Sequence, residues 1–288
     1  MHESCNSLKK SPQIFRRLTG IGPGEFTNLL AQLTPIYEEW NDQRLSKKTR
    51  QRKVGAGGKF HLDLEDRLLM LLIYYRCYIT HALLGFLFQI DNSNVGRNIN
   101  PLMPLLASIF KIPEKRIKVN REEVEVLFFD ATEQRVQRPE SNPKQSYSGK
   151  KKAHTRKVQV VVSKRKDSTG TTKTRIEAVS KSFPGNVHDK KVYDESRMRT
   201  PREVRKRADS GYQGAAAMKV PHKKPSKKEL TSEQKEENRL HSSDRICVEH
   251  GIGKMKLWRI VSDRFRNRSS IHGLIFKNIA GLSNLMFA

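Results

Sequence analysis

The sequence predicts an α/β protein in which an all-α part precedes a domain built on a central sheet. Two observations predict this order: apolar residues recur at helical spacing in several segments before residue 118, and short Val- and Thr-rich segments follow residue 120. The 288 residues suffice for about two domains. Lys and Arg number 56 against 30 Asp and Glu, which gives a net charge of +26. Such a surplus favours nucleic acid as the partner, although charge alone names no activity.

Composition excludes several classes of protein. The longest apolar run, Leu68–Tyr75, is far shorter than the roughly 20 residues that cross a bilayer, and Met1–Lys10 lacks the apolar centre of a signal peptide. The cysteines, Cys5, Cys77 and Cys247, are far apart and form no CxxC pair, so the sequence indicates neither a disulfide framework nor a zinc module. We therefore expect a cytoplasmic, nucleoid-associated protein with reduced cysteines and no membrane partner.

Four segments are predicted along the chain. Residues 1–45 form a helical segment in which apolar residues recur at helical spacing. Residues 46–62 form a basic linker rich in Lys, Arg and Gly, which is either solvated or lies along DNA phosphates. Residues 63–118 form a second helical domain, and residues 119–288 form the domain with the sheet.

The pattern within 63–118 is typical of a helix-turn-helix DNA reader. Helices are predicted over residues 64–78 and 80–88, and Asp91 is a cap for a third helix that runs through Val95 and beyond. The face that would enter a major groove carries Ser93, Asn94, Arg97 and Asn98. The alternative is an ordinary three-helix bundle whose polar side faces water.

The second domain is predicted to hold three strands, then a helix, a strand and a long helix. In chain order these elements cover residues 124–129, 157–163, 174–180, 188–198, 204–208 and 231–261. The second and third strands form a hairpin around the turn residues 167–170. The charged segment 204–208 has a poor strand propensity. The long helix opens with the capping-box pair Thr231 and Gln234.

Three acidic residues stand out by their positions. Asp130 closes the first predicted strand, Asp209 follows the predicted strand 204–208, and Glu249 lies in the long helix. Three carboxylates brought together would repel one another, so such a cluster needs cations, and hard oxygen ligands favour magnesium or manganese. Two such ions would activate a water or a 3′-hydroxyl and stabilise the leaving oxygen in phosphodiester transfer. The alternative for a single Asp at a strand end is a turn cap.

The surroundings of these acids differ in how strongly they suggest function. Arg245, Glu249 and Lys256 share one face of the long helix by their spacing, so that one metal ligand would be flanked by two phosphate-binding cations. His188 and Asp189 are a candidate pair for supporting the metal ligands, but Asp189 stands at the start of a predicted helix, where favourable charge near the helix dipole is an adequate explanation.

Four blocks of the sequence together resemble a known family. They are FFDATE at 128–133, YSGKKKAHT at 147–155, ADSGYQG at 208–214 and VEHGIGKMK at 248–256. In this order they resemble the DDE transposases of bacterial insertion sequences, and the insertion-sequence-five family in particular. The resemblance extends from about Phe15 to Ala288 and includes the helix-turn-helix over 64–106.

The resemblance implies a fold, a site and a cofactor. It implies a ribonuclease-H-like catalytic domain over 119–288, with Asp130, Asp209 and Glu249 as catalytic and metal-binding residues for two Mg²⁺ ions, with Mn²⁺ as the alternative. Arg245 and Lys256 match a family pattern and would bind phosphates, but Ser242 stands where related families have Tyr. The basic block comprises Lys150, Lys151, Lys152 and His154. It would contact phosphates or be a solvated hairpin.

The first hypothesis is a transposase that binds the terminal inverted repeats of its own element and catalyses metal-dependent cleavage and strand transfer. Its partners would be double-stranded DNA, as element ends and target, and further copies of the chain in a homodimer or higher oligomer of the synaptic complex. Two alternatives stay open: a catalytically inactive, transposase-derived DNA-binding protein, and a related nuclease that cuts without joining.

Overall fold

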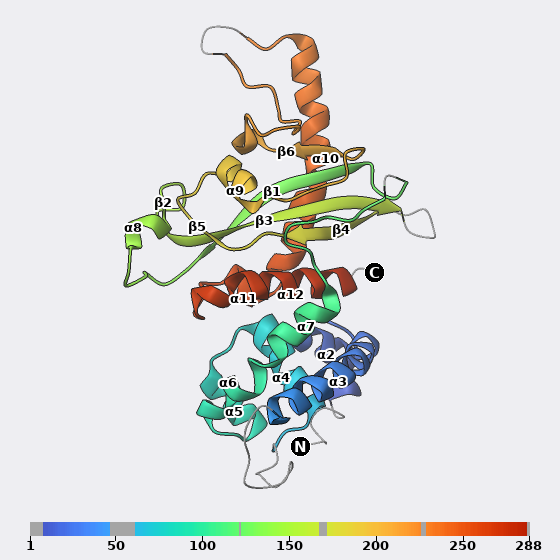
Figure 1. The fold of residues 1–288 in the computed structure, drawn as a ribbon, viewed down its shortest axis with the longest axis vertical. Coiled ribbons are helices and arrows are strands. Elements are labelled where there is room, and N and C mark those ends of the chain that lie inside the picture. The colour runs from blue at the N-terminus through green and yellow to red at the C-terminus, as the bar shows by residue number, and fades with distance from the viewer. Residues whose placement is uncertain (1–7, 47–60, 121, 167–171, 226–228, 287–288) are drawn as a thin grey trace. The chain divides into compact units, whose positions relative to one another are not determined.

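The computed structural model describes residues 8–46, 61–120, 122–166, 172–225 and 229–286. It separates into two compact units, one with residues up to Lys111 and Trp258–Ile260, the other with Ile112–Leu257 and Val261–Phe287 (Figure 1). Most of the predicted basic linker, 46–62, lies outside the described residues. No described helix is long and apolar enough to cross a bilayer.

The first unit is helical throughout its described part. Its helices are α2 (Pro12–Thr19), α3 (Pro23–Ser46), α4 (Leu64–Cys77), α5 (His81–Phe88), α6 (Asn92–Ile99) and α7 (Leu102–Phe110). The predicted buried helix over 64–78 is confirmed, because α4 is buried from Asp66 to Tyr75. Phe15 and Phe26 meet edge to face in the core, with 5.3 Å between ring centroids.

The helix predicted to run through Val95 and beyond is wrong as a single element, since the chain forms α6 and then α7. Pro101 and Pro104 have no backbone N–H, so the hydrogen bonds of one continuous helix cannot run through this segment. The predicted cap is confirmed, because the Ser93 N–H donates a 2.8 Å hydrogen bond to the Asp91 carboxylate. Helix α5, its turn and α6 thus follow the predicted order.

The second unit contains a mixed sheet. Its strands are β1 (Val126–Arg135), β2 (Tyr147–Ser148), β3 (Ala153–Lys166), β4 (Thr172–Val179), β5 (Phe183–Pro184) and β6 (Arg205–Ala208). Strand β1 pairs antiparallel with β3 and parallel with β6, whereas β2, β4 and β5 pair antiparallel with β3. The predicted pairing of 157–163 with 174–180 is confirmed by β3 and β4. Its turn, 167–170, lies outside the described residues.

Helices cover both faces of this sheet (Figure 1). The helices of this unit include α8 (Pro143–Ser146), α9 (Asp189–Ser196), α10 (Ser232–Lys256) and α12 (His272–Leu285), and its 3₁₀ turns are η1 (Ser210–Tyr212) and η2 (Ser269–Ile271). Phe129 of β1 packs with Tyr193 of α9 and with Tyr212 in one core cluster. On α10, a Cβ added to Gly251 would lie 2.8 Å from a methyl group of Val162, so the close approach of α10 to β3 requires glycine.

Two further elements show how pairing and burial override local propensity. The charged segment 205–208 forms β6 because β1 pairs with it at the edge of the sheet, where Arg205 forms an ion pair with Glu125. Helix α10 begins at the predicted capping box but ends at Lys256 instead of 261. Trp258 is fully buried and belongs to the first unit, so the chain leaves the helical path there and then forms α11 (Arg259–Ser262).

Candidate active site

The register of two parallel strands brings Asp130 next to Asp209. Strands β1 and β6 pair from Val126 with Arg205 to Phe129 with Ala208. The residue after the last pair is an aspartate in both segments, Asp130 within β1 and Asp209 just after β6, so the two aspartates follow at the same level. Such strands lie about 4.8 Å apart, and residues at one level point to the same face. Two acids that are remote in the sequence therefore meet in space.

The prediction that Asp130 closes a strand is wrong, whereas Asp209 does follow the end of β6. Strand β1 continues to Arg135 because β3 supplies a pairing partner at every position from Leu127 onward. Asp130 is consequently held in mid-strand, where its Oδ1 accepts a 2.8 Å hydrogen bond from the Ala131 N–H. Asp209 instead caps the turn η1, where its Oδ1 accepts a 2.9 Å hydrogen bond from the Gly211 N–H.

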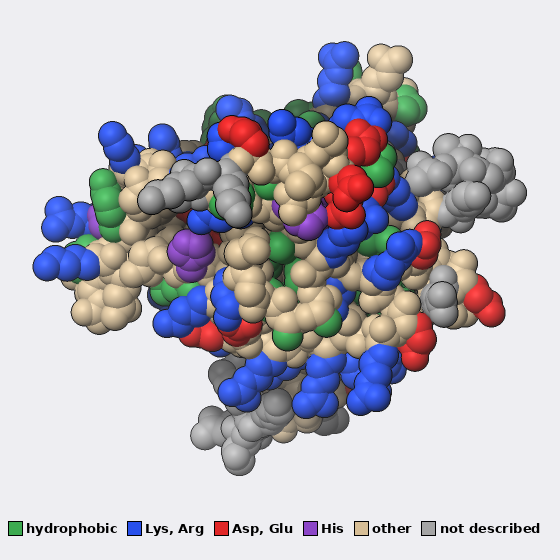
Figure 2. All heavy atoms as spheres, turned by 90° about the horizontal axis from the view of Figure 1, so that it is seen from above, with side chains coloured by type: hydrophobic (Ala, Val, Ile, Leu, Met, Phe, Trp, Pro, Cys, Tyr) green, Lys and Arg blue, Asp and Glu red, His purple; other side chains and the backbone are tan. Residues whose placement is uncertain are grey.

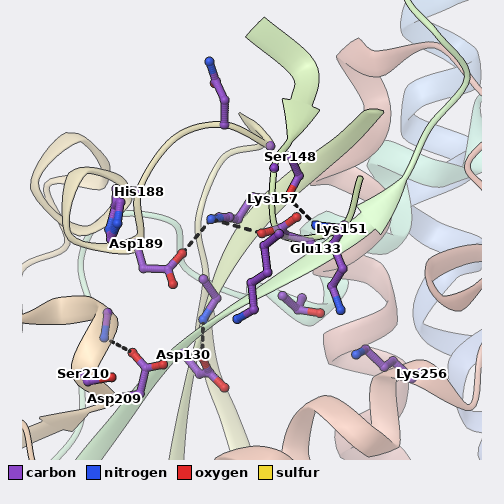
Figure 3. Close-up of a pocket in the computed structure, with 17 residues that line it drawn as sticks. Asp130, Glu133, Ser148, Lys151, Lys157, His188, Asp189, Asp209, Ser210 and Lys256 are labelled. Atoms are coloured by element: carbon purple, nitrogen blue, oxygen red, sulfur yellow. Dashed lines mark hydrogen bonds and ion pairs between the residues drawn. The ribbon is translucent and has the colours of Figure 1, made fainter. Parts of the chain in front are cut away.

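Both aspartates line a cavity of about 470 Å³ (Figure 3). The acidic and basic residues of its lining are Asp130, Glu133, Lys150, Lys151, Lys157, His188, Asp189, Asp209 and Lys256. Figure 3 shows the two aspartates on one side of the cavity and Lys151 and Lys256 on the other. The cavity thus combines acidic side chains with lysines suited to phosphate groups.

Helix α10 brings only part of its predicted set to this cavity. Arg245 lies with its Nη2 4.0 Å from Oδ2 of Asp130, and Lys256 lines the cavity. Glu249 is exposed and is not among the lining residues. In the described part of the chain, no three Asp, Glu, His or Cys side chains are grouped closely enough to hold a metal ion. The structure therefore brings together two of the three predicted acids.

The basic block divides at the turn between β2 and β3. Lys150 and Lys151 line the cavity, whereas Lys152 and His154 do not. Lys152 has a positive φ of 46°, the left-handed conformation that closes this turn. The His154 ring meets the Tyr147 ring edge to face at 5.6 Å between centroids.

Sequence reasoning missed a buried ion-pair cluster at Lys157. Only 7% of this side chain is exposed, and its Nζ lies 2.7 Å from Asp189 and 3.3 Å from Glu133. It also donates a 2.8 Å hydrogen bond to the Val187 carbonyl. The interpretation of Asp189 as a helix-start charge is therefore incomplete. The available signal was the register of β1 and β3, which pairs Glu133 with Lys157.

Burial raises the pKa of the Asp130 carboxyl from its ordinary 3.8 to about 6. The Ala131 N–H opposes this rise by hydrogen bonding to the charged form, whereas the charges of Asp209 and Asp189 add to it. Arg245 lowers the pKa, with an effect that lies between those of Asp209 and Asp189. Burial is therefore the main cause of the raised pKa, and the charge of Asp209 is the largest of the charge effects that add to it.

The predicted DNA-reading residues of α6 do not share one environment. Ser93 and Arg97 are exposed and Asn94 is half-buried. Asn98 is only 7% exposed, and its side-chain amide donates a 2.9 Å hydrogen bond to the Asn94 carbonyl. The carbonyl of Asn98 in turn accepts a 3.1 Å hydrogen bond from the buried guanidinium of Arg67. Asn98 thus belongs to the packed side of the helix, away from the exposed face.

Comparison with known proteins identifies the family. Residues 129–284 match the DDE superfamily endonuclease family, and residues 60–112 match the helix-turn-helix of that superfamily. The chain belongs to the DDE endonuclease superfamily. The predicted helix-turn-helix is thereby confirmed, as is the α/β fold class with its ribonuclease-H-like catalytic domain, with which the mixed sheet and its helices are consistent. The helix-turn-helix of this endonuclease implies DNA binding.

Two relatives match this DDE endonuclease along nearly its whole length. One is described as a transposase for insertion sequence element IS702 of Microchaete diplosiphon, with 32% identity over 293 residues that cover 98% of each chain. The other is described as a transposase for insertion sequence element IS112 of Streptomyces albus G, with 27% identity over 277 residues that cover 95% of each chain. No solved structure matches the chain.

The residues of the cavity fit a divalent cation, which endonucleases of this superfamily generally use. Asp130 and Asp209 supply hard oxygen ligands, and Mg²⁺ in proteins is commonly held by one or two carboxylates, with waters and substrate phosphates completing its shell. Gly211 leaves room at this point, since a Cβ there would lie 3.0 Å from Oδ1 of Asp209 and 2.9 Å from Oδ2 of Asp189. Burial disfavours the charged form of Asp130, and a cation bound beside it would favour that form.

Proposed function

We propose that this DDE endonuclease is a transposase that binds the terminal inverted repeats of its own element, cleaves DNA there and joins the freed 3′ end to target DNA. The observation that supports this most strongly is the position of Asp130 and Asp209, which directly follow a strand pair and line a cavity together with lysines. The similarity of nearly the whole chain to proteins described as transposases extends the proposal from cutting to transposition.

The proposed cofactor is a pair of Mg²⁺ ions, with Mn²⁺ as the alternative, held by Asp130 and Asp209. When bound, these ions would activate a water or a 3′-hydroxyl and stabilise the leaving oxygen. Glu249 stays the proposed third acid, because it lies on the helix that also carries Arg245 and Lys256. Its exposed side chain would then reach the aspartates only in the complex with DNA.

Lysines and an arginine of the cavity would hold the DNA backbone. Lys150, Lys151 and Lys256 line it, and Arg245 lies beside Asp130. Figure 2 shows Lys and Arg side chains more often than Asp and Glu on the viewed face, in keeping with the net charge of +26. These contacts would be independent of base sequence, so their loss would weaken binding to every DNA and reduce its salt dependence.

Helix α6 would read the element ends from a major groove. Ser93 and Arg97 are exposed, and Asn94 beside them accepts a 3.2 Å hydrogen bond from Arg97. We retain these three for base contact and assign Asn98 to holding the helix in place. Because an element has two ends, joining both requires a homodimer or higher oligomer in the synaptic complex. Such a protein would work on the nucleoid in the cytoplasm.

The decisive experiment uses the full chain, DNA carrying the element ends, and Mg²⁺. Asp130→Asn is expected to abolish cleavage and joining while leaving the Kd for end DNA within about twofold, measured at one fixed salt concentration. Asp194→Asn is the matched control, because Asp194 is an exposed acid of α9 paired with Lys190. Parallel loss of binding and cleavage in Asp130→Asn would instead make Asp130 structural.

The same assay separates the two alternatives. Wild-type protein that binds end DNA but never nicks it, with or without Mg²⁺ or Mn²⁺, would be a DNA-binding protein without catalysis. Cleavage that yields free 3′ ends but no joined products on a supercoiled target would indicate a nuclease. Joined products with a simultaneous requirement for both ends would support the proposal.

A further inference from the structure

The two carboxylate oxygens of Asp189 face different partners. Oδ1 lies 2.7 Å from Nζ of Lys157. Oδ2 lies on the other side, 2.9 Å from the point where a Gly211 Cβ would sit, and Oδ1 of Asp209 lies 3.0 Å from the same point. Oδ2 of Asp189 and Oδ1 of Asp209 are therefore at most about 6 Å apart. Asp189 thus connects a buried lysine to one of the two aspartates proposed to bind metal.

Lys157 fixes the position of Asp189. The lysine is almost fully buried, and its amine has three acceptors, on Asp189, Glu133 and the Val187 carbonyl. An ammonium has three protons, so this set satisfies it completely. The dashed lines in Figure 3 join Lys157 to both acids. The Asp189 side chain is therefore held at a defined distance from Asp209.

Asp189 adds to the negative charge around Asp130 and Asp209. Lys157 already faces Glu133 as well as Asp189, so it cannot neutralise both acids. Asp189 is among the charges that raise the pKa of Asp130 and of the buried Tyr212 hydroxyl. A carboxylate fixed next to a divalent-cation site strengthens cation binding by its field and by orienting the ligands.

We propose that Asp189 is a positioning residue of the active site: clamped by Lys157, it holds a negative charge beside Asp209 and thereby strengthens divalent-cation binding by Asp130 and Asp209. This inference rests on the proposed function for the identity of those two ligands. It adds an acid outside the predicted set of Asp130, Asp209 and Glu249. It also gives Lys157 a role in the site, because this lysine holds the Asp189 side chain in place.

Glu133 provides a matched control for Asp189. Both acids accept from Lys157, and Glu133 also accepts a 3.0 Å hydrogen bond from the Thr155 hydroxyl. Unlike Asp189, however, Glu133 contributes none of the three atoms nearest to a Cβ placed on Gly211, which belong to Asp189 and Asp209. If the role of Asp189 were only to neutralise Lys157, then Asp189→Asn and Glu133→Gln would behave alike.

The test measures binding of Mn²⁺ alone to the full chain, from the electron paramagnetic resonance signal of the free ion. Asp189→Asn keeps an oxygen acceptor for Lys157 and is expected to raise the Kd for Mn²⁺ about tenfold. Glu133→Gln is expected to change it less than threefold. Gly211→Ala should weaken binding as well, because its methyl group would collide with the oxygens of both Asp189 and Asp209. Asp189→Glu restores the charge and should recover part of the affinity.

The outcomes are distinguishable from failure of the proposed function. A Kd for Asp189→Asn within twofold of wild type, or an equal loss in Glu133→Gln, would overturn the role of Asp189. Absence of Mn²⁺ binding in wild type would overturn it too. If wild type binds Mn²⁺ but does not cut DNA, only the transposase proposal fails. Circular dichroism and melting temperature establish that each variant is folded. If Asp189→Asn does not fold, Asp189→Glu takes its place in the measurement.

Discussion

Two carboxylate pairs in the same cavity are neutralised in different ways. Glu133 and Asp189 share the buried ammonium of Lys157, within 3.3 Å and 2.7 Å. Asp130 and Asp209 lie side by side, and the guanidinium nearest Asp130 is 4.0 Å away. The first pair is partly balanced by this lysine (the balanced pair), whereas the second retains its negative charge for a ligand (the unbalanced pair). Close contact with a fixed cation therefore separates the acids that a lysine holds in place from the acids left to bind a ligand.

The largest expected effect is the loss of DNA cleavage when a residue of the unbalanced pair, Asp130 and Asp209, is replaced. Asp209→Asn should reduce metal-dependent DNA cleavage at least about a thousandfold, because an amide cannot replace a charged metal ligand in phosphoryl transfer. Single-turnover cleavage of end DNA in excess Mg²⁺ measures it. Since Asp209 also caps η1 and Asn can serve the same cap, the melting temperature should stay close to that of wild type. A variant that cuts within tenfold of wild type would remove Asp209 from the chemistry.

Disturbing the balanced pair, Glu133 and Asp189, should lower the stability of the protein. Lys157→Met leaves Glu133 and Asp189 without their shared cation in a buried site, so the free energy of unfolding should fall by about 3–5 kcal/mol. Urea denaturation measures this. The control is Lys190→Met, which removes an exposed partner of Asp194 and should cost less than about 1 kcal/mol. Equal effects for the two lysines would contradict the comparison.

The unbalanced pair should make stability depend on pH in the absence of metal. The folded-state pKa of Asp130 is raised to about 6, so the unfolded chain loses this proton at lower pH than the folded one. Stability should therefore fall as pH rises from about 4 to about 6, by about 3 kcal/mol in all. Asp130→Asn should be more stable than wild type by up to that amount above pH 6. Urea denaturation in EDTA should find no difference below pH 4.

Divalent cations should reduce the difference in stability between Asp130→Asn and wild type, because they would stabilise the wild type. Mg²⁺ at a hundred times its Kd would stabilise wild type by about 2.7 kcal/mol and leave Asp130→Asn nearly unchanged. The melting temperature with and without Mg²⁺ measures both, and Ca²⁺ separates binding from cleavage. An equal Mg²⁺ shift in wild type and Asp130→Asn would place the bound ion away from this pair.

The smallest effect is expected at Tyr212. Its ring packs in the core, but the described residues offer its buried hydroxyl no hydrogen-bond partner. Tyr212→Phe should therefore change the free energy of unfolding by less than about 1 kcal/mol, because no hydrogen bond is lost. A loss of cleavage without a loss of stability would instead assign the hydroxyl to the neighbouring acids.

The sequence predicted more of the fold than of the site. Periodic apolar residues indicated α4 and the β3–β4 hairpin, because a core imposes its period on the chain. Asp130 and Asp209 were found as acids near strands, but the end of the first strand was misplaced. The apolar run stops at Phe129, whereas backbone pairing with β3 continues to Arg135.

What escaped prediction depends on tertiary contacts. Lys157 and Asp189 are 32 residues apart, and neither has a neighbour in the sequence that indicates their pairing. Asn98 lies one position after Arg97, yet the rotation of about 100° per residue turns it toward the core. Glu249 was identified from its spacing on α10, but spacing along one helix does not fix the distance to a strand.

The position of β6 at the edge of the sheet has a consequence for synthesis of the protein on the ribosome. Strands β1, β3 and β4 can pair as soon as about residue 180 has emerged, because each neighbour is already present. The parallel edge strand comes later and brings Asp209 with it. A nascent chain therefore brings the two aspartates together only late in translation, and truncated products that end before residue 205 lack one of the two proposed metal ligands.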